Sequence, residues 1–228
     1  MTARAPIAVA LDTSDLATAT AWATAVAPAV QAVKVGLQLF CHDGPNAVEK
    51  VRAAADVELF LDLKLHDIPA TIAGAAKSLK SLQPTYLTVH AGAGPAGIAA
   101  AADVLPDTKI AGVTILTSLA ASDLDLLGIA GPPRDAVRRL ARLAVDAGAR
   151  ALVCSPQEVA AVRDEVGPAV VLITPGVRPA GGEVQDQARV ETPERALANG
   201  SDLLVIGRPI TGATDVGRAA ADLAASLR

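Results

Sequence analysis

The sequence predicts an α/β fold in which parallel strands alternate with helices, and three observations support this prediction. Eight apolar segments rich in β-branched residues are separated by eight segments with helical patterns. The strand segments are almost continuously apolar, which indicates that both faces of the sheet are covered and that the strands run parallel. Eight such units in 228 residues fit a (β/α)₈ TIM barrel. An open, doubly wound sheet is the alternative, although the first strand–helix turn, LDTSDLAT, lacks the Gly-x-Gly-x-x-Gly pattern of dinucleotide-binding sheets.

The predicted strands are short, and several of them lead into polar residues. The first ends in Asp12, the fourth ends in His90, and Thr117 and Ser118 follow the fifth. In chain order the predicted strands lie at 6–12, 32–36, 59–64, 86–90, 109–116, 151–155, 170–177 and 203–207.

The predicted helices are located by their terminal residues and by amphipathic patterns. Ser14 is predicted to be the N-cap of the first helix, and Pro69 occupies a favourable first position of the third. Gly148 is the expected C-cap of a strongly amphipathic helix. The eight helices are predicted at about 14–26, 45–55, 68–82, from 95, 134–148, 156–166, 193–199 and 212–227.

Composition limits the class of protein. The length suits a single domain over residues 1–228 with a substantial core. A formal net charge of −4 and only 2% aromatic residues argue against a nucleic-acid partner. No apolar run is long enough for a signal peptide or a membrane span. The two cysteines, Cys41 and Cys154, are far apart and lack metal-ligand spacing, so we expect a reduced, cytoplasmic protein.

The third strand carries an Asp-x-Lys-x-x-Asp motif formed by Asp62, Lys64 and Asp67. Asp62 and Lys64 are two residues apart on a strand, so they are predicted to point to the same face. In a barrel that face is the interior, close to the carboxyl end of the strand. An acid and a base confined together cost desolvation free energy unless they pair or take part in chemistry. A purely structural ion pair at the strand end is the alternative.

Polar residues recur at the predicted carboxyl ends of the strands, where barrel enzymes place their active sites. They are Asp12, Lys34, Asp62, Lys64, Asp67, His90, Thr117, Ser118, Arg178 and Arg208. Charges scattered by chance would fall mainly on helix faces, so this recurrence predicts a catalytic or binding site.

The last two strands end in glycine and arginine residues that are typical of phosphate sites. Pro175-Gly176-Val177-Arg178 follows the seventh strand, and Gly207-Arg208 follows the eighth. Glycine lets the main chain approach an anion, and an arginine side chain can donate two hydrogen bonds to its oxygens. A plain turn with a surface arginine is the alternative for Gly207-Arg208.

Taken together, these motifs resemble the orotidine 5′-phosphate decarboxylases over essentially the whole chain. The matching segments are Leu11-Asp12, Lys34-Val35-Gly36, residues 62–69 with Thr71, Leu116-Thr117-Ser118, residues 174–178 with Asp186-Gln187, and residues 205–210. The resemblance implies conversion of orotidine 5′-monophosphate to UMP and CO₂ in pyrimidine biosynthesis, without a metal or other cofactor.

One position distinguishes the orotidine 5′-phosphate decarboxylases from related families that share the motif. The Asp-x-Lys-x-x-Asp motif is shared with sugar-phosphate decarboxylases and hexulose-phosphate synthases, which place a glutamate near the end of strand two to help hold Mg²⁺. This chain has Lys34 there, and a lysine repels a divalent cation. A Mg²⁺-dependent sugar-phosphate lyase and a non-catalytic phosphate sensor are the competing functions. A lysine flanked by carboxylates speaks against the sensor.

The resemblance also implies residue roles. Lys64 donates a proton to C6 of the pyrimidine, Asp62 lies beside the substrate carboxylate, and Lys34 and Asp67 flank Lys64. The remaining implied contacts are Asp12, Lys34, Asp67 and Thr71 to the ribose, Thr117 or Ser118 to the base, and Arg178, Gln187, Gly207 and Arg208 to the phosphate. A homodimer is implied in which Asp67 and Thr71 serve the partner's site; alternatively, Asp67 caps its own helix.

Three other features are predicted to be structural. His90 is more typical of a buried, hydrogen-bonded histidine, because the neighbouring Ala91-Gly92 offers no partner for catalysis. Cys154 lies on an apolar strand and is predicted to belong to the core. Three arginines are predicted to form a solvated helix face: Arg138, Arg139 and Arg142.

Overall fold

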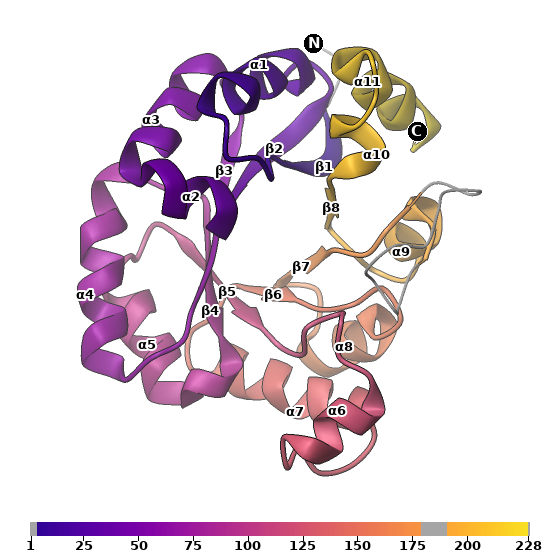
Figure 1. Ribbon diagram of the computed structural model, residues 1–228. Helices are drawn as coiled ribbons and strands as arrows, with labels where there is room; N and C mark the ends of the chain where they lie inside the picture. The colour runs from indigo at the N-terminus through magenta and orange to yellow at the C-terminus, as the bar shows by residue number, and fades with distance from the viewer. Residues whose placement is uncertain (1–3, 179–190, 228) are drawn as a thin grey trace.

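The computed structural model, which describes residues 4–178 and 191–227, shows eight parallel strands closed into a barrel (Figure 1). Strands adjacent in sequence are adjacent in the barrel, and β1 pairs with β8 to close it. The strands are β1 Ala5–Ala10, β2 Val30–Gly36, β3 Glu58–Leu65, β4 Tyr86–His90, β5 Lys109–Val113, β6 Ala151–Val153, β7 Val171–Thr174 and β8 Leu203–Ile206. The predicted (β/α)₈ barrel is confirmed, and the open sheet is excluded.

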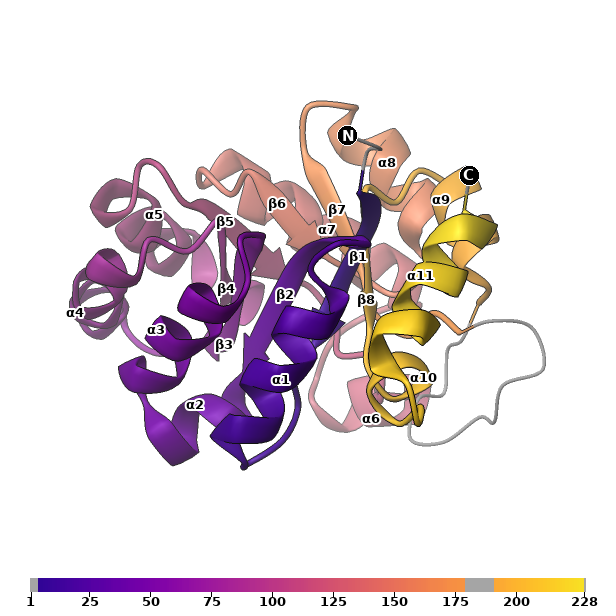
Figure 2. The same cartoon turned by 90° about the horizontal axis from the view of Figure 1, so that it is seen from above.

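Helices surround the strands, as the two perpendicular views in Figure 1 and Figure 2 show. They are α1 Leu16–Val26, α2 Leu37–Asp43, α3 Pro45–Ala54, α4 Pro69–Leu79, α5 Gly94–Val104, α6 Ala121–Leu126, α7 Pro133–Asp146, α8 Val159–Val166, α9 Pro193–Ala198, α10 Arg208–Thr211 and α11 Val216–Ser226, with 3₁₀ turns η1 Lys80–Leu82 and η2 Ala91–Ala93. None of the helices in the described part of the chain has the length and apolar character needed to cross a membrane.

Several element boundaries differ from the predictions, and three of them have identifiable reasons. The N-cap of α1 is Asp15 rather than Ser14, because the Asp15 carboxylate accepts hydrogen bonds from the backbone N–H groups of Ala17 and Thr18. The fifth and seventh strands end three residues earlier than predicted. The neighbouring β6 has only three residues, and the β-ladder stops where its pairing partners stop.

Eight buried residues fill the interior of the barrel, one from each strand: Ala8, Ala32, Phe60, Tyr86, Ala111, Ala151, Ile173 and Leu203. The large members lie on adjacent strands, where the Phe60 and Tyr86 rings meet edge to face at 5.9 Å between centroids. Because inward-facing residues alternate along a strand, the next inward positions lie two residues further on. On the second to fourth strands these positions are Lys34, Asp62 and Thr88, so the sheet itself brings polar groups to the carboxyl end.

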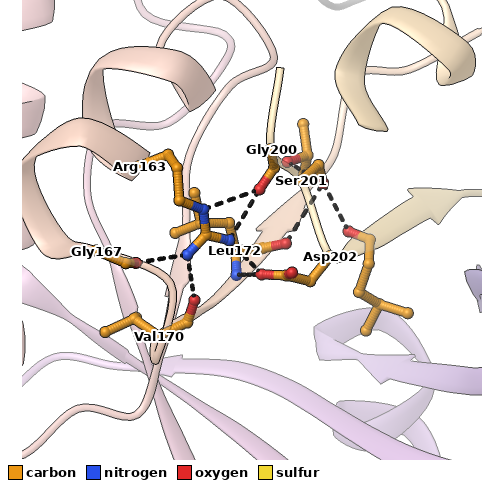
Figure 3. A network of polar contacts seen from close by, with 9 residues as sticks. Arg163, Gly167, Val170, Leu172, Gly200, Ser201 and Asp202 are labelled. Carbon is orange, nitrogen blue, oxygen red and sulfur yellow. Dashed lines mark hydrogen bonds and ion pairs between the residues drawn. The ribbon is translucent and has the colours of Figure 1, made fainter. Parts of the chain in front are cut away.

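At the opposite end of the barrel, Arg163 is the centre of a hydrogen-bond network (Figure 3). The Arg163 guanidinium donates hydrogen bonds of 2.7–3.2 Å to the backbone oxygens of Gly167, Val170 and Gly200. It also pairs with Asp202, whose carboxylate accepts from the amide at the start of β7. This network joins α8 to the amino ends of β7 and β8. It stabilises the end of the barrel opposite the polar residues.

Candidate active site

A cavity of about 320 Å³ opens among the carboxyl ends of the strands. The aromatic ring of Phe60, from the interior layer, contributes to its lining, together with the apolar residues Ala10, Val113, Val153 and Val205. Four charged residues also line it: Asp12, Lys34, Asp62 and Lys64. The cavity therefore lies at the rim where the sequence places its polar residues.

The four charged side chains form an alternating row. The Lys34 ammonium lies 3.0 Å from an Asp12 carboxylate oxygen and 3.6 Å from an Asp62 oxygen. The Lys64 Nζ donates to both oxygens of Asp62, at 2.8 and 2.9 Å. Asp62 thus lies between two ammonium groups, and the row as a whole is close to electrically neutral.

Asp62 is held in its ionised form. Burial of its carboxyl group raises the pKa, but the charges of Lys34 and Lys64 outweigh that effect. Hydrogen bonds from Lys64 and from the hydroxyl of Thr88 act in the same direction, and the pKa of Asp62 lies below its ordinary value. The carboxylate can therefore orient the Lys64 ammonium near neutral pH.

The backbone at Lys64, whose side chain contacts Asp62, departs from a regular β-strand. Its φ is +48°, in the left-handed region that side-chain-bearing residues seldom occupy. The pairing of β3 with β4 shifts between Leu61 and Leu65, so the strand bulges at the motif. The predicted convergence of Asp62 and Lys64 is present, but regular strand alternation does not continue through Lys64. Bulges of this kind re-aim side chains at functional sites.

Asp67 and Thr71 lie outside the charged row of their own chain. Both residues are exposed, and Asp67 accepts a hydrogen bond from the adjacent Ile68 amide at 2.7 Å. The N-cap of α4 is Ile68, and no side chain caps this helix. The interpretation that Asp67 caps its own helix is therefore wrong. The chain leaves the barrel after β3 ends at Leu65, and Asp67 does not join Lys64 of its own chain.

The residues expected to contact base and phosphate are grouped around the same opening. Thr117, Ser118 and Gly207 line the cavity, and Arg208 begins α10 directly after Gly207. Arg178 is half-buried beyond β7. Gln187, the other residue expected to contact the phosphate, lies outside the described residues, as does Asp186 of the matching segment.

Two features of the site were missed by the sequence interpretation. Thr88, fully buried on β4, hydrogen-bonds both Asp62 and the backbone of Lys64. A polar residue in the apolar run YLTVH was a usable signal for it. The second feature is a stack of the His66 and His90 rings, 4.8 Å apart and 9° from parallel. Because the ring positions depend on the bulge, sequence spacing did not indicate this contact.

His90 is hydrogen-bonded, as expected, but it is only partly buried, and the neighbouring Gly92 supplies its partner. The backbone N–H of Gly92 donates to its Nδ1 at 3.1 Å. Burial, the adjacent His66 and the Lys64 charge lower the pKa of His90 below its ordinary value of 6.5. His90 is therefore a neutral imidazole at neutral pH, next to the end of the charged row.

The remaining structural predictions hold. Cys154 is buried in the core, and burial raises the pKa of its thiol to about 12, which leaves it unreactive. Arg138 and Arg142 lie on the outer face of α7 and pair with Glu165 and Asp146. Within the described residues, no group of three or more His, Cys, Asp or Glu side chains is arranged to hold a metal ion.

The fold and the site together define a (β/α)₈-barrel protein whose carboxyl rim carries an alternating acid–base row. The model of one family matches residues 5–223, almost the whole chain. The chain belongs to this family, the Orotidine 5′-phosphate decarboxylase / HUMPS family, as the resemblance of its motifs indicated.

Similar proteins support this assignment over most of their length. The chain is 65% identical to the orotidine 5′-phosphate decarboxylase of Thermobifida fusca, over 98% of this chain and 96% of that protein. It is 57% identical to the protein of the same name from Frankia casuarinae, over 98% and 88% of the two chains. The crystal structure of orotidine 5′-phosphate decarboxylase from Lactobacillus acidophilus superposes with a TM-score of 0.85 at 33% identity, covering 98% of this chain and 99% of that one.

Proposed function

We propose that the protein is an orotidine 5′-phosphate decarboxylase, a carboxy-lyase that converts orotidine 5′-monophosphate to UMP and CO₂ in de novo pyrimidine biosynthesis without a cofactor. The observation that carries the proposal is the Lys64 ammonium held by both oxygens of Asp62 at the cavity. Relatives at 65% and 57% identity bear this enzyme's name. The two cysteines are unpaired, which suits a cytoplasmic enzyme.

Lys64 is the proton donor in this proposal. The bond between C6 and the carboxylate carbon breaks, CO₂ leaves, and the electron pair stays on C6, where it takes a proton from Lys64 Nζ. The ring offers no conventional electron sink, so the positive charge of the ammonium must stabilise the developing carbanion. One charge at about 4 Å contributes roughly 4 kcal/mol at an effective dielectric of about 20. This contribution is useful but too small to account for catalysis alone.

Binding of the remote phosphate supplies a further part of the transition-state stabilisation. Arg178, Gln187, Gly207 and Arg208 bind the phosphate in this proposal, and Thr117 or Ser118 contacts the base. Binding energy from a part of the substrate that does not react can hold the reacting carbon against Lys64 and Asp62. Asp12 and Lys34 contact the ribose and keep the charged row in order.

The active enzyme is proposed to be a homodimer with composite sites. Asp67 and Thr71 are exposed and are not among the residues that line the cavity of their own chain, and the adjacent Ile68 has 65% of its surface exposed. An exposed isoleucine between two polar residues suits a surface that a second subunit covers. In a C₂ dimer, symmetry would place Asp67 and Thr71 of each chain at the partner's cavity.

Loss of ultraviolet absorbance on mixing the protein with orotidine 5′-monophosphate tests the activity, because decarboxylation removes the conjugated carboxylate. We expect turnover in the wild type, and none in Lys64→Ala. Lys50→Ala, which removes an exposed lysine of α3, is the control and should retain full activity. Activity of Lys64→Ala within about tenfold of the wild type, a difference of about 1.4 kcal/mol, would remove Lys64 from the proton-donor role.

The same assay distinguishes a Mg²⁺-dependent sugar-phosphate lyase. Lys34 Nζ lies 3.0 Å from Asp12 and 3.6 Å from Asp62, so an ammonium already occupies the space between these carboxylates. We expect full turnover of orotidine 5′-monophosphate in excess chelator. Turnover that requires added Mg²⁺ would contradict the cofactor-free mechanism.

A further inference from the structure

The bulge at the motif leaves one residue of β4 facing several of β3. Leu61 pairs with Leu87, and the next pair is Leu65 with Val89. Three residues of β3 therefore lie opposite Thr88 alone. In a regular parallel ladder, each N–H of β3 that faces β4 would find a backbone carbonyl there. At a bulge that match is lost, and the freed amide needs another acceptor.

The hydroxyl of Thr88 supplies that acceptor. The backbone N–H of Lys64 donates to Thr88 Oγ1 at 2.8 Å, and the same hydroxyl donates to Asp62 Oδ1 at 3.1 Å. Thr88 is 0% exposed, so water does not compete for either hydrogen bond. A hydroxyl is the smallest side-chain group that can accept from an amide and donate to a carboxylate at once. Valine has the same shape but neither ability.

We propose that Thr88 is a positioning residue that fixes both the backbone of Lys64 and the carboxylate of Asp62. The inference rests on the proposed function for its effect on catalysis, whereas its effects on Asp62 and on the Lys64 amide need no substrate. Thr88 itself does not touch the reacting atoms. Thr88 acts by holding Lys64, the proton donor, and Asp62, which orients the Lys64 ammonium, in the relative positions that the bulge sets.

Loss of the hydroxyl has two consequences that can be measured separately. The Lys64 amide loses its acceptor, so the left-handed backbone at φ +48° loses a restraint and the ammonium is less well placed. Asp62 loses a donor that favours its ionised form, so its pKa rises. Phosphate contacts at the far side of the cavity are unchanged, so kcat should fall much more than substrate affinity.

The test compares Thr88→Val with Thr88→Ser and with Thr108→Val. Thr108 is the matched control because it is also buried and donates its hydroxyl proton to a backbone oxygen, that of Pro84, away from the motif. We expect kcat of Thr88→Val to fall about 10- to 100-fold with KM changed by less than about threefold. Thr88→Ser should restore most of the activity, and Thr108→Val should lose stability only.

A titration of Asp62 by carbon NMR and exchange of the Lys64 amide hydrogen test the same inference without substrate. We expect the Asp62 pKa to rise in Thr88→Val, and the Lys64 amide to exchange faster in Thr88→Val than in Thr88→Ser. If Thr88→Val does not fold, Thr88→Ala provides the same comparison. A wild-type Lys64 amide that exchanges as fast as an exposed one would also overturn the inference.

The outcomes separate this inference from the proposed function. A wild-type protein that does not turn over orotidine 5′-monophosphate defeats the proposed function, while the Asp62 titration still decides the role of Thr88. An unchanged Asp62 pKa and unchanged kcat in Thr88→Val would defeat the inference alone. Equal losses of activity in Thr88→Val and Thr108→Val, in proportion to stability, would show a purely structural residue and also defeat it.

Discussion

Lys64 combines an unfavourable backbone conformation with the side chain on which the proposed chemistry depends. A residue with a Cβ at φ +48° costs about 1–2 kcal/mol relative to the right-handed conformation. Such a cost persists only where surrounding contacts hold it, here the hydrogen bonds to Thr88 and Asp62. Stability and function therefore make opposite demands at this position.

This conflict predicts an unusual order of stabilities. Among variants that both lack the ammonium, Lys64→Gly should be more stable than Lys64→Ala by about 1 kcal/mol, because glycine adopts positive φ without strain. Urea unfolding monitored by circular dichroism measures the difference. The control pair is Lys50→Gly and Lys50→Ala within α3, where the order should reverse by about 1 kcal/mol. The same order at both positions would contradict strain at Lys64.

His90 predicts a pH dependence of stability. Its pKa in the folded protein lies below the ordinary value of 6.5, so between the two values the unfolded chain binds more protons than the folded one. The stabilisation is complete above the unfolded-state pKa and is lost as the pH falls towards the folded-state pKa. His90→Asn keeps an acceptor for the Gly92 amide but cannot be protonated. The free energy of unfolding of this variant should therefore decrease less than that of the wild type as the pH falls.

The measurement is the free energy of unfolding at about pH 7.5 and about pH 5.5, on either side of the ordinary histidine pKa. We expect a smaller decrease in His90→Asn than in the wild type. His66→Leu keeps an apolar group against the His90 ring but removes the second imidazole, and should give an intermediate decrease. An equal decrease in all three proteins would rule out His90 as the source.

At the scale of elements, β5 and α7 approach so closely that only glycine fits at one position. A Cβ added at Gly112 would lie 2.7 Å from the Cβ of Ala144 and 3.2 Å from a Leu152 side-chain carbon. Small residues such as Gly112 and Ala144 therefore have a packing role, because they allow α7 to lie close to the barrel.

This close contact predicts that Gly112→Ala destabilises the protein by about 1–3 kcal/mol, the usual cost of overpacking. Gly74→Ala is the control, because nothing lies within 4 Å of its added Cβ and it occupies the exposed side of α4. That change should stabilise the protein by about 0.5–1 kcal/mol through helix propensity. Chemical denaturation of both variants measures the contrast, and a neutral Gly112→Ala would show that α7 can shift.

The elements were predictable because their signals are local. Continuous apolar runs located the strands within a few residues, and Pro69 located the start of α4. The short helices α2, α6 and α10 were missed because segments of four to seven residues carry too few turns for a periodic pattern. The bulge at Lys64 was missed for a different reason: a period of two describes a regular strand, and nothing in the spacing marks where regularity stops.

At the scale of the whole molecule, the site residues fall into two groups. Asp12, Lys34, Asp62 and Lys64 come together within one chain, as their shared rim predicts. Asp67 and Thr71 do not join them. The resemblance of the motifs implied this division, because it assigned Asp67 and Thr71 to a partner's site, but strand spacing alone put Asp67 on the same rim as Lys64 and gave Thr71 no position.

Mixing subunits tests the shared site. Lys64→Ala and Asp67→Ala should each be inactive alone, and exchange of subunits should restore one complete site in each heterodimer. The matched control mixes Lys64→Ala with Asp62→Ala. These two residues lie in the same chain's row, so no heterodimer contains a complete site. We expect activity to recover in the first mixture but not in the second. If subunit exchange is demonstrated and neither mixture regains activity, the shared-site proposal is wrong.

The pairing of β1 with β8 has a consequence for the order of events during synthesis. The first strand leaves the ribosome early, but its partner β8 ends at Ile206. One edge of β1 therefore stays unpaired until nearly the whole chain has been made. Exposed edges of this kind are templates for intermolecular association. A nascent chain stalled before β8 should therefore aggregate or recruit chaperones, whereas one stalled after α11 should not. The barrel therefore cannot close until synthesis is nearly finished, and the pairing of the first strand depends on the arrival of the eighth.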